Sequence, residues 1–346
     1  MNHSGGSHVF LTGATGLIGR HLLRRLLDAD PARTVSILSR RPCAIPCDRV
    51  AVLRGDLAQP RFGLNPADWD ALRRSVTGII HCGADVRFGL PLEESRAVNV
   101  GGAATAIELA RGCSRLRQFA HISTVYVAGS AAVELPEAPY DNVHGFFNTY
   151  EQSKYEAEKL VQAEPALPAA IWRLSNVVGD SRTGHVEQYN HVHQLLRLAP
   201  HAPLPILPAT PEARIDVIAT DWAVAAIAIL FDRRFRAGEI RNLCAGYERS
   251  LSVAEMTRVT FDGLTSRAPK LVSPERFRLF AKSAEALGNA RIRALLEQLS
   301  LFVPHLSVRQ EFRNDSTLEL LRSEGMPDPD SADLFRRVVL HCRQAA

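Results

Sequence analysis

Apolar and polar positions alternate with two different periods along the first half of the chain. Short apolar runs of the kind that form buried strands occur at residues 9–12, 34–39, 50–54, 78–82, 119–123 and 170–174. Between them lie stretches in which apolar residues recur three and four positions apart, as on one face of a helix. The clearest of these are residues 17–27, 98–111 and 150–162. Strict alternation of strand and helix predicts an α/β fold with a doubly wound parallel sheet.

The pattern loosens after about residue 185. Residues 200–211 carry five prolines and predict a loop, followed by a short strand at 214–218, a helix at 222–231 and a strand at 240–244. The rest is mostly helical in pattern, with candidate helices at 276–299, 318–323 and 332–344. We therefore expect one α/β domain over residues 1–185, to which 214–245 return. Residues 186–213 and 246–346 would form a smaller, mostly helical substrate-binding region.

Composition narrows the class of protein. The 346 residues are 46% hydrophobic and 23% charged, with a net charge of +4. No apolar run reaches the roughly 18 residues of a membrane span, and no signal region precedes the first strand, so a cytoplasmic protein is expected. No basic run is long enough to suggest nucleic acid as a partner.

The cysteines and histidines do not predict a metal site. Cys43 and Cys47 lack a second Cys or His pair at suitable spacing. His191 and His193 are two residues apart and would not share a helical face.

The first residues that carry chemistry follow the first strand and open the first helix. They form a glycine-rich turn, Thr12-Gly13-Ala14-Thr15-Gly16-Leu17-Ile18-Gly19. In this context glycines let the backbone approach a pyrophosphate, which then lies at the helix N-terminus. The turn predicts a Rossmann-type dinucleotide site. Its candidate cofactor-binding residues are Gly13, Thr15, Gly16, Leu17, Ile18 and Gly19.

The end of the second strand indicates which dinucleotide binds. An NAD site places a carboxylate there for the ribose 2′-hydroxyl, whereas this strand ends in Ser39-Arg40-Arg41. Two guanidinium groups suit a 2′-phosphate, because charge-assisted Arg–phosphate bonds are strong and directional. We therefore predict NADP(H) as the cofactor and favour Arg40 over Arg41 as the residue that binds its 2′-phosphate. The alternative is that Arg41 points to solvent.

A tyrosine and a lysine four residues apart form the candidate catalytic pair. Tyr150 and Lys154 share one face of the predicted helix at 150–162. A phenol ionises near pH 10, and a nearby ammonium would favour its ionised form, so we expect Lys154 to tune Tyr150 as an acid–base group. Thr124, at the end of the preceding strand, would hydrogen-bond the substrate oxygen. The register between Thr124 and its neighbour Ser123 is uncertain by one residue.

Taken in order, these motifs resemble the extended short-chain dehydrogenase/reductase family over roughly residues 8–245. The Gly-x-x-Gly-x-x-Gly spacing, Gly55-Asp56-Leu57, the run from Ile79 to Ala84 and the Tyr-x-x-x-Lys pair carry the resemblance. It implies that Tyr150 protonates a carbonyl oxygen, that Asp56 approaches the adenine, and that Asn99 supports the catalytic region or merely caps a helix. Further cofactor-binding residues implied by the family are Leu57, Cys82, Gly83, Ala84, Asn99, Ser123, Lys154, Val177 and Val178.

Several segments resemble one branch, the thioester reductase and fatty-acyl-CoA reductase-like domains. They are His81 to Phe88, Asn99 to Gly102, Ile122 to Val125 and Arg173 to Gly184. The resemblance implies NADPH-dependent reduction of an acyl thioester to an aldehyde or alcohol. Such domains usually follow a carrier protein in one chain. The sequence contains none, so we expect the acyl group to arrive in trans, on coenzyme A or on a separate carrier protein.

Three alternatives stay open from the sequence. Within the same superfamily the chain could be an NADP-dependent ketone or aldehyde reductase, or a sugar-nucleotide epimerase or dehydratase. Val125 and Tyr126 stand where a dehydratase would carry acidic residues, which counts against the dehydratase. The third alternative is a non-catalytic NADP-sensing regulatory protein, against which the intact Tyr150 and Lys154 count. A homodimer is left open.

Overall fold

A seven-stranded parallel sheet forms the centre of the molecule, in the order β12-β7-β5-β4-β1-β2-β3. The structure is a computed structural model that describes residues 6–43, 45–198, 206–264, 267–286 and 304–344. The sheet contains β1 (His8–Thr12), β2 (Thr34–Ser39), β3 (Val50–Arg54), β4 (Gly78–His81), β5 (Gln118–Thr124), β7 (Ala169–Leu174) and β12 (Ile240–Leu243). The predicted α/β fold with a doubly wound parallel sheet is confirmed.

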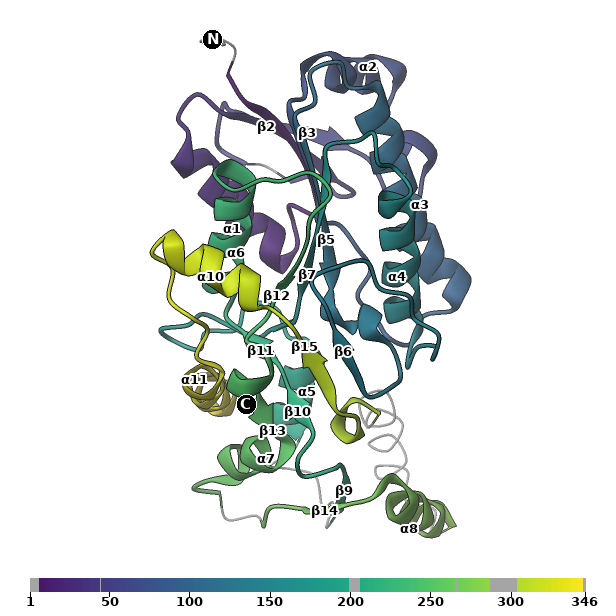
Figure 1. The fold of residues 1–346 in the computed structure, drawn as a ribbon, viewed down its shortest axis with the longest axis vertical. Helices are drawn as coiled ribbons and strands as arrows, with labels where there is room; N and C mark the ends of the chain where they lie inside the picture. Colours follow the sequence, from purple (N-terminus) through teal and green to yellow (C-terminus); the bar gives the residue numbers. More distant parts are fainter. Residues whose placement is uncertain (1–5, 44, 199–205, 265–266, 287–303, 345–346) are drawn as a thin grey trace.

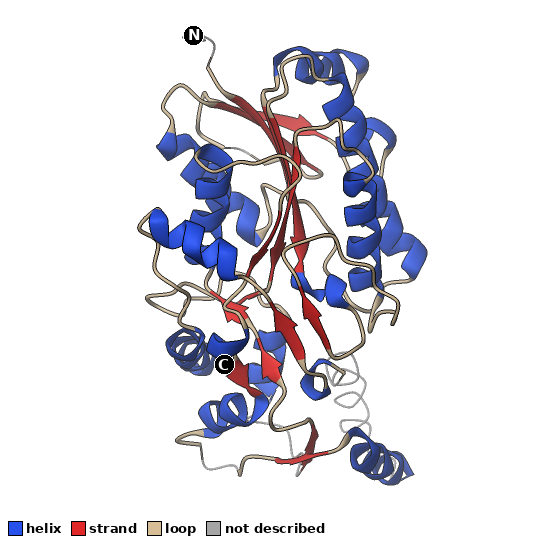
Figure 2. Ribbon diagram, viewed as in Figure 1, coloured by secondary structure: helices blue, strands red, loops and turns tan. Residues whose placement is uncertain are grey.

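Helices cover both faces of this sheet (Figures 1 and 2). α1 (Leu17–Ala29) and α6 (Thr220–Asp232) lie on one face, and α2 (Pro66–Ser75), α3 (Leu92–Gly112) and α4 (Thr149–Gln162) lie on the other. The central strands β4 and β7 are buried along their whole length, which is why they read as continuous apolar runs rather than alternating ones. The edge strand β3 has no buried residue.

The start of α4 is fixed by its own sequence. The Asn148 side chain accepts a hydrogen bond from the Glu151 amide at 3.0 Å, and the Glu151 carboxylate accepts one from the Phe147 amide at 3.0 Å. Such reciprocal bonds satisfy amides that a helix N-terminus leaves unpaired. They set where the helix that carries Tyr150 and Lys154 begins.

The region beyond the sheet contains small two-stranded pairs as well as helices. β8 (Asn176–Val177) pairs with β11 (Val217–Ile218), β9 (Ile206–Pro208) with β14 (Lys270–Val272), β10 (Arg214–Ile215) with β13 (Leu251–Ser252), and β6 (Val133–Leu135) with β15 (Gln310–Phe312). The helices are α5 (His191–Leu198), α7 (Val253–Phe261), α8 (Pro274–Ala286), α10 (Asp315–Ser323) and α11 (Ser331–Gln344). Short 3-10 helices are η1 (Pro60–Gly63), η2 (Val125–Ala128), η4 (Tyr247–Arg249) and η5 (His305–Ser307).

Two predicted elements differ from the structure. The strand expected at 214–218 is two strands, β10 and β11, which pair with partners in different sheets. The loop expected at 200–211 contains β9, because parallel pairing with β14 satisfies its backbone despite Pro208. The helix expected at 276–299 is described as α8 as far as Ala286, and residues 287–299 lie outside the described residues.

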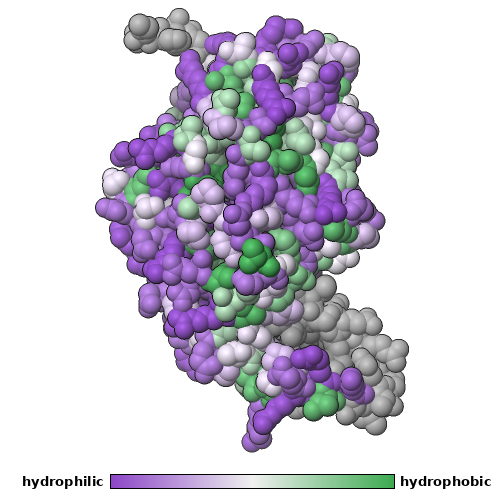
Figure 3. All heavy atoms as spheres, turned by 45° about the vertical axis from the view of Figure 1, so that its right-hand side comes forward, coloured by the Kyte–Doolittle hydropathy of each residue, from purple (hydrophilic) through white to green (hydrophobic). Residues whose placement is uncertain are grey.

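The molecular surface is mainly hydrophilic on the face shown in Figure 3, where hydrophobic side chains are exposed in small groups. None of the helices in the described ranges is long and apolar enough to cross a lipid bilayer.

Candidate active site

The glycine-rich turn packs β1 directly against the end of β4. Gly13 has φ of 74°, and a Cβ atom there would lie 2.7 Å from the Gly83 nitrogen. A Cβ atom at Gly19 would collide with the Gly13 carbonyl oxygen. Both positions therefore require glycine, and α1 begins at Leu17 with no side-chain cap on Gly16. The first amides of α1 are left to bind an anion.

A cleft of about 510 Å³ runs along the carboxyl ends of the parallel strands. This is the edge at which open α/β sheets bind ligands. Seventeen of the predicted site residues line it: Gly13, Thr15, Gly16, Leu17, Ile18, Gly19, Arg40, Asp56, Leu57, Cys82, Gly83, Ala84, Ser123, Thr124, Tyr150, Lys154 and Val177. The glycine turn and the candidate catalytic side chains thus share one cavity.

Three predicted residues do not line this cleft. Arg41 is exposed outside it, Val178 is fully buried in the core, and Asn99 is buried beneath the wall of the cleft. Asn99 holds the loop after β4, since its amide oxygen accepts from the Asp85 nitrogen at 2.8 Å and its amide nitrogen donates to the Asp85 carbonyl at 3.0 Å. Val178 and Asn99 thus do not line the cleft in this structure, and their contact with the cofactor stays a prediction.

The candidate catalytic side chains meet at the end of β5. The Thr124 hydroxyl lies close enough to the Tyr150 phenol to lower the pKa of that phenol, whereas the Ser123 hydroxyl has no hydrogen-bond partner among the described residues. Phe88 stacks on the Tyr150 ring with 5.8 Å between the ring centroids. Tyr150 is half-buried, with its ring forming part of the cleft wall. This geometry favours Thr124 over Ser123 as the partner of Tyr150.

Lys154 is buried and bonded to β5. Its ammonium donates to the Ile122 carbonyl at 2.7 Å and lies 3.3 Å from Nε2 of His121. Burial lowers the pKa of Lys154 to about 8, although the Glu158 and Cys82 side chains oppose that shift. Burial also raises the pKa of Tyr150, and the hydrogen bond from Thr124 only partly offsets this. The expected lowering of the Tyr150 pKa by Lys154 is therefore not present in this structure, because the ammonium is directed at β5.

Two buried histidines extend the polar contacts of Lys154. His121 stacks on His81 with centroids 5.4 Å apart, and His81 hydrogen-bonds the Thr12 hydroxyl at 3.0 Å. Burial, and then the charge of Lys154, lower the pKa of His81 to about 3 and that of His121 well below its usual range. Both rings are therefore neutral, and His121 is available as an acceptor for the ammonium.

Part of the cleft wall consists of residues that no sequence motif predicted. Phe88 and Tyr126 line it beside Tyr150, while Gln188 and Asn190 line it from the segment between β8 and α5. Tyr126 lies two residues after Thr124, and this proximity was the one available signal. The segment before α5 carries no motif, and only the pairing of β8 with β11 brings it to the cleft.

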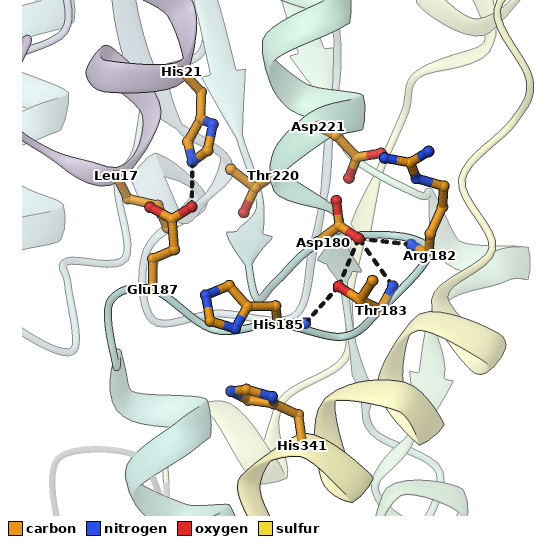
Figure 4. Close-up of a pocket in the computed structure, with 10 residues that line it drawn as sticks. All are labelled: Leu17, His21, Asp180, Arg182, Thr183, His185, Glu187, Thr220, Asp221 and His341. Atoms are coloured by element: carbon orange, nitrogen blue, oxygen red, sulfur yellow. Dashed lines mark hydrogen bonds and ion pairs between the residues drawn. The ribbon is translucent and has the colours of Figure 1, made fainter. Parts of the chain in front are cut away.

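A second cleft of about 530 Å³ adjoins the first at Leu17 (Figure 4). Its acidic groups are already engaged: Glu187 pairs with His21 at 3.0 Å, and Asp180 accepts from the amides of Arg182 and Thr183.

Across the described residues, no group of three or more His, Cys, Asp or Glu side chains is placed to hold a metal ion. The six cysteines are free thiols.

Fold and site together define an NAD(P)-dependent oxidoreductase of the extended short-chain dehydrogenase/reductase class. Residues 11–227 match the model of a family of NAD-binding domains described as "Male sterility protein", and the chain belongs to this family. The predicted family and enzyme class are thereby confirmed.

Part of the chain is similar in sequence to segments of much longer biosynthetic enzymes. The chain is 32% identical over 212 residues to an isonitrile lipopeptide synthase of Streptomyces coeruleorubidus, a match that covers 55% of this chain and 14% of that protein. It is 28% identical over 226 residues to the L-2-aminoadipate reductase large subunit of Penicillium chrysogenum, covering 55% and 16%. The chain thus matches only a small part of the length of these relatives.

Solved structures extend the similarity to the whole fold. The terminal R domain from the myxalamid PKS-NRPS biosynthetic pathway superposes with a TM-score of 0.82 at 24% identity, covering 99% of this chain and 92% of that one. The reductase domain of a nonribosomal peptide synthetase from Mycobacterium tuberculosis gives a TM-score of 0.68 at 19% identity, covering 99% and 94%. At these identities the likeness concerns the fold.

Proposed function

We propose that this protein is an NADPH-dependent reductase that converts an acyl thioester to an aldehyde, or onward to an alcohol. The observation that carries the proposal is that the glycine turn, Arg40, Thr124 and Tyr150 all line one cleft. The similarity to a protein named as a reductase and to solved reductase domains supports the same chemistry.

The residues of the cleft fit NADP(H). The absence of side chains at Gly13 and Gly19 lets the turn pack tightly, and the first amides of α1, which no side chain caps, are free to bind a pyrophosphate. Arg40 lies at the end of β2 in the cleft, where a 2′-phosphate would be bound. Arg41 lies outside the cleft, which supports Arg40 as the phosphate-binding residue.

The chain's own residues would handle the oxygen and its proton. NADPH supplies the hydride when bound. Thr124 and Tyr150 donate hydrogen bonds to the carbonyl oxygen, and Tyr150 transfers its proton as the oxygen becomes an alkoxide. Lys154, held by Ile122 and His121, supplies a positive charge in the same cleft. The resulting thiohemiacetal collapses to aldehyde and thiol.

The substrate would be an acyl thioester of coenzyme A or of a carrier protein. One of the similar solved structures is a thiolation–reductase di-domain from an archaeal nonribosomal peptide synthetase, with a TM-score of 0.73 at 17% identity, covering 99% of this chain and 77% of that one. We assign the nucleotide-binding part to residues 1–185 with 214–245, and the substrate-binding region to 186–213 and 246–346. A cytoplasmic location and a homodimer stay predictions.

The test follows NADPH absorbance with purified protein and a panel of acyl-CoAs, aldehydes and ketones. We expect thiol release and NADPH oxidation with acyl-CoAs, and a loss of at least about 100-fold in kcat for Tyr150→Phe, because a positioned proton donor contributes that much. Tyr155→Phe, on the same helix but outside the cleft, is the matched control. Turnover of aldehydes or ketones alone would contradict the thioester assignment.

A further inference from the structure

Tyr126 is a second phenol in the wall of the cleft, and the proposed mechanism does not use it. It lies in η2, two residues after Thr124, and its amide donates to the Thr124 hydroxyl at 3.2 Å. Its phenol oxygen accepts a hydrogen bond from the amide nitrogen of Asn176 in β8. The hydrogen bond therefore ties the phenol oxygen in η2 to β8.

The direction of this bond follows from the other contact of Asn176. The same amide nitrogen lies 2.8 Å from the Asp216 carbonyl oxygen, which can only accept. The amide cannot be turned around, because its oxygen would then face a carbonyl oxygen. Tyr126 is thus the acceptor, and its own hydrogen has no acceptor among the described residues. That hydrogen is available to a molecule in the cleft.

The phenol is also fixed in place and protonated. The edges of His305 and Phe312 pack against the ring, with centroids 5.0 and 6.0 Å away. Burial raises the pKa of Tyr126, and the nearby Asp216, Glu151 and Tyr150 act in the same direction, while only the Asn176 bond opposes them. The Tyr126 hydroxyl therefore stays protonated, and the packing of its ring fixes the position of its oxygen in the cleft.

We propose that Tyr126 donates this hydrogen to the sulfur of the bound thioester. The inference rests on the proposed function. The carbonyl oxygen already has two donors, Thr124 and Tyr150, which suffice for its two lone pairs. The other polar atom of the reacting group is sulfur, whose negative charge grows as the C–S bond breaks. A donor aimed at that charge stabilises the transition state more than the ground state.

The step balances without transfer of the Tyr126 proton. Hydride joins the carbonyl carbon and Tyr150 protonates the oxygen, which gives the thiohemiacetal. When the C–S bond breaks, its electron pair leaves with sulfur, the C=O bond re-forms, and the hydroxyl proton returns to Tyr150. Sulfur then takes a proton from solvent. The sum is thioester, NADPH and a proton to aldehyde, thiol and NADP⁺.

The test compares two substrates of one enzyme. Tyr126→Phe is assayed with an acyl-CoA and with the aldehyde of the same acyl group, because reduction of the aldehyde has no leaving sulfur. We expect kcat/KM for the thioester to fall about tenfold, the effect of one hydrogen bond, and that for the aldehyde to change less than about twofold. A series of thioesters with thiols of different pKa should show a steeper dependence on thiol pKa in the variant.

Asn176→Ala is the second variant, since it frees the phenol to rotate without removing it. We expect Asn176→Ala to lower the ratio of kcat/KM for the thioester to kcat/KM for the aldehyde, but less than Tyr126→Phe does. Tyr155→Phe should leave this ratio unchanged. An equal loss with both substrates, or no loss with either, overturns the role of Tyr126 while the thioester reductase assignment stands. A wild-type enzyme that reduces aldehydes but no thioester overturns both.

Discussion

At the scale of single residues, charge and burial decide what each group in the cleft can do. Arg40 and Arg41 are adjacent and both exposed, yet only Arg40 lines the cleft. Lys154 and Tyr150 share a helix face, as the four-residue spacing predicts, but the ammonium bonds to β5 rather than to the phenol. Spacing therefore brings the pair together, and the neighbouring strand determines where the positive charge lies.

Arg40→Ala should raise KM for NADPH by about 10- to 100-fold and leave KM for NADH nearly unchanged. The reason is that a charge-assisted hydrogen bond contributes about 1.5–3 kcal/mol, and NADH lacks the 2′-phosphate. Steady-state kinetics with both cofactors measure the effect. Arg41→Ala, the matched control outside the cleft, should change neither constant by more than about twofold. An equal rise in KM for NADPH in the two variants would mean that Arg40 is not the sole arginine that binds the 2′-phosphate.

The activity should fall as the pH rises above about 8. Burial lowers the pKa of Lys154 to about 8, so the ammonium loses its proton near that pH instead of near pH 10. Below about pH 8 the positive charge of Lys154 in the cleft is intact, and above that pH kcat/KM should drop about tenfold per pH unit. A pH profile of kcat/KM for the free enzyme checks this. A profile that stays flat to pH 10 would show that the charge of Lys154 is not needed.

At the scale of elements, the glycine turn shows how close packing and ligand binding use the same residues. Neither Gly13 nor Gly19 has room for a side chain, because a Cβ atom at Gly13 would collide with the end of β4 and one at Gly19 with the backbone of the turn. Gly101 differs, because a Cβ atom there would lie 3.7 Å from its nearest neighbour, the Arg96 carbonyl oxygen. Packing therefore requires glycine at positions 13 and 19 but not at position 101.

Gly19→Ala should abolish detectable NADPH binding and lower the free energy of unfolding by about 1–3 kcal/mol, since the added methyl group displaces the turn. Gly101→Ala, in the interior of α3, should leave binding unchanged and stabilise the protein by up to about 1 kcal/mol. Cofactor titration by fluorescence and chemical denaturation measure the two effects. Full NADPH affinity in Gly19→Ala would mean that the turn is not the pyrophosphate site.

At the scale of the whole molecule, one buried ion pair joins the sheet to the catalytic helix. Arg173 in β7 and Glu158 in α4 are each 1% exposed, with a closest distance of 2.8 Å. Arg173 also donates to the carbonyl oxygens of Pro136 and Ala138, next to β6. β6 in turn pairs with β15, which lies about 140 residues after Arg173 in the sequence. The pair therefore connects segments that are distant in the sequence.

Arg173→Met should lower the free energy of unfolding by about 3–5 kcal/mol, because it leaves the Glu158 carboxylate buried without its partner. The double variant Arg173→Met/Glu158→Leu should recover part of that loss, since no buried charge remains. Urea denaturation of wild type, both single variants and the double variant gives the coupling energy. Additive losses would mean that the two side chains act independently.

The sequence by itself determined the local chemistry: the glycine turn, the missing carboxylate after β2, the four-residue spacing of Tyr150 and Lys154, and the strand–helix alternation of the sheet. These depend on residues close together in the chain, so their patterns are readable. Only the tertiary structure decided that Phe88 and Asn176 line the cleft together with Tyr150, that Lys154 bonds to β5, and that β15 pairs with β6. Such contacts join segments far apart in sequence, and no local period or motif encodes them.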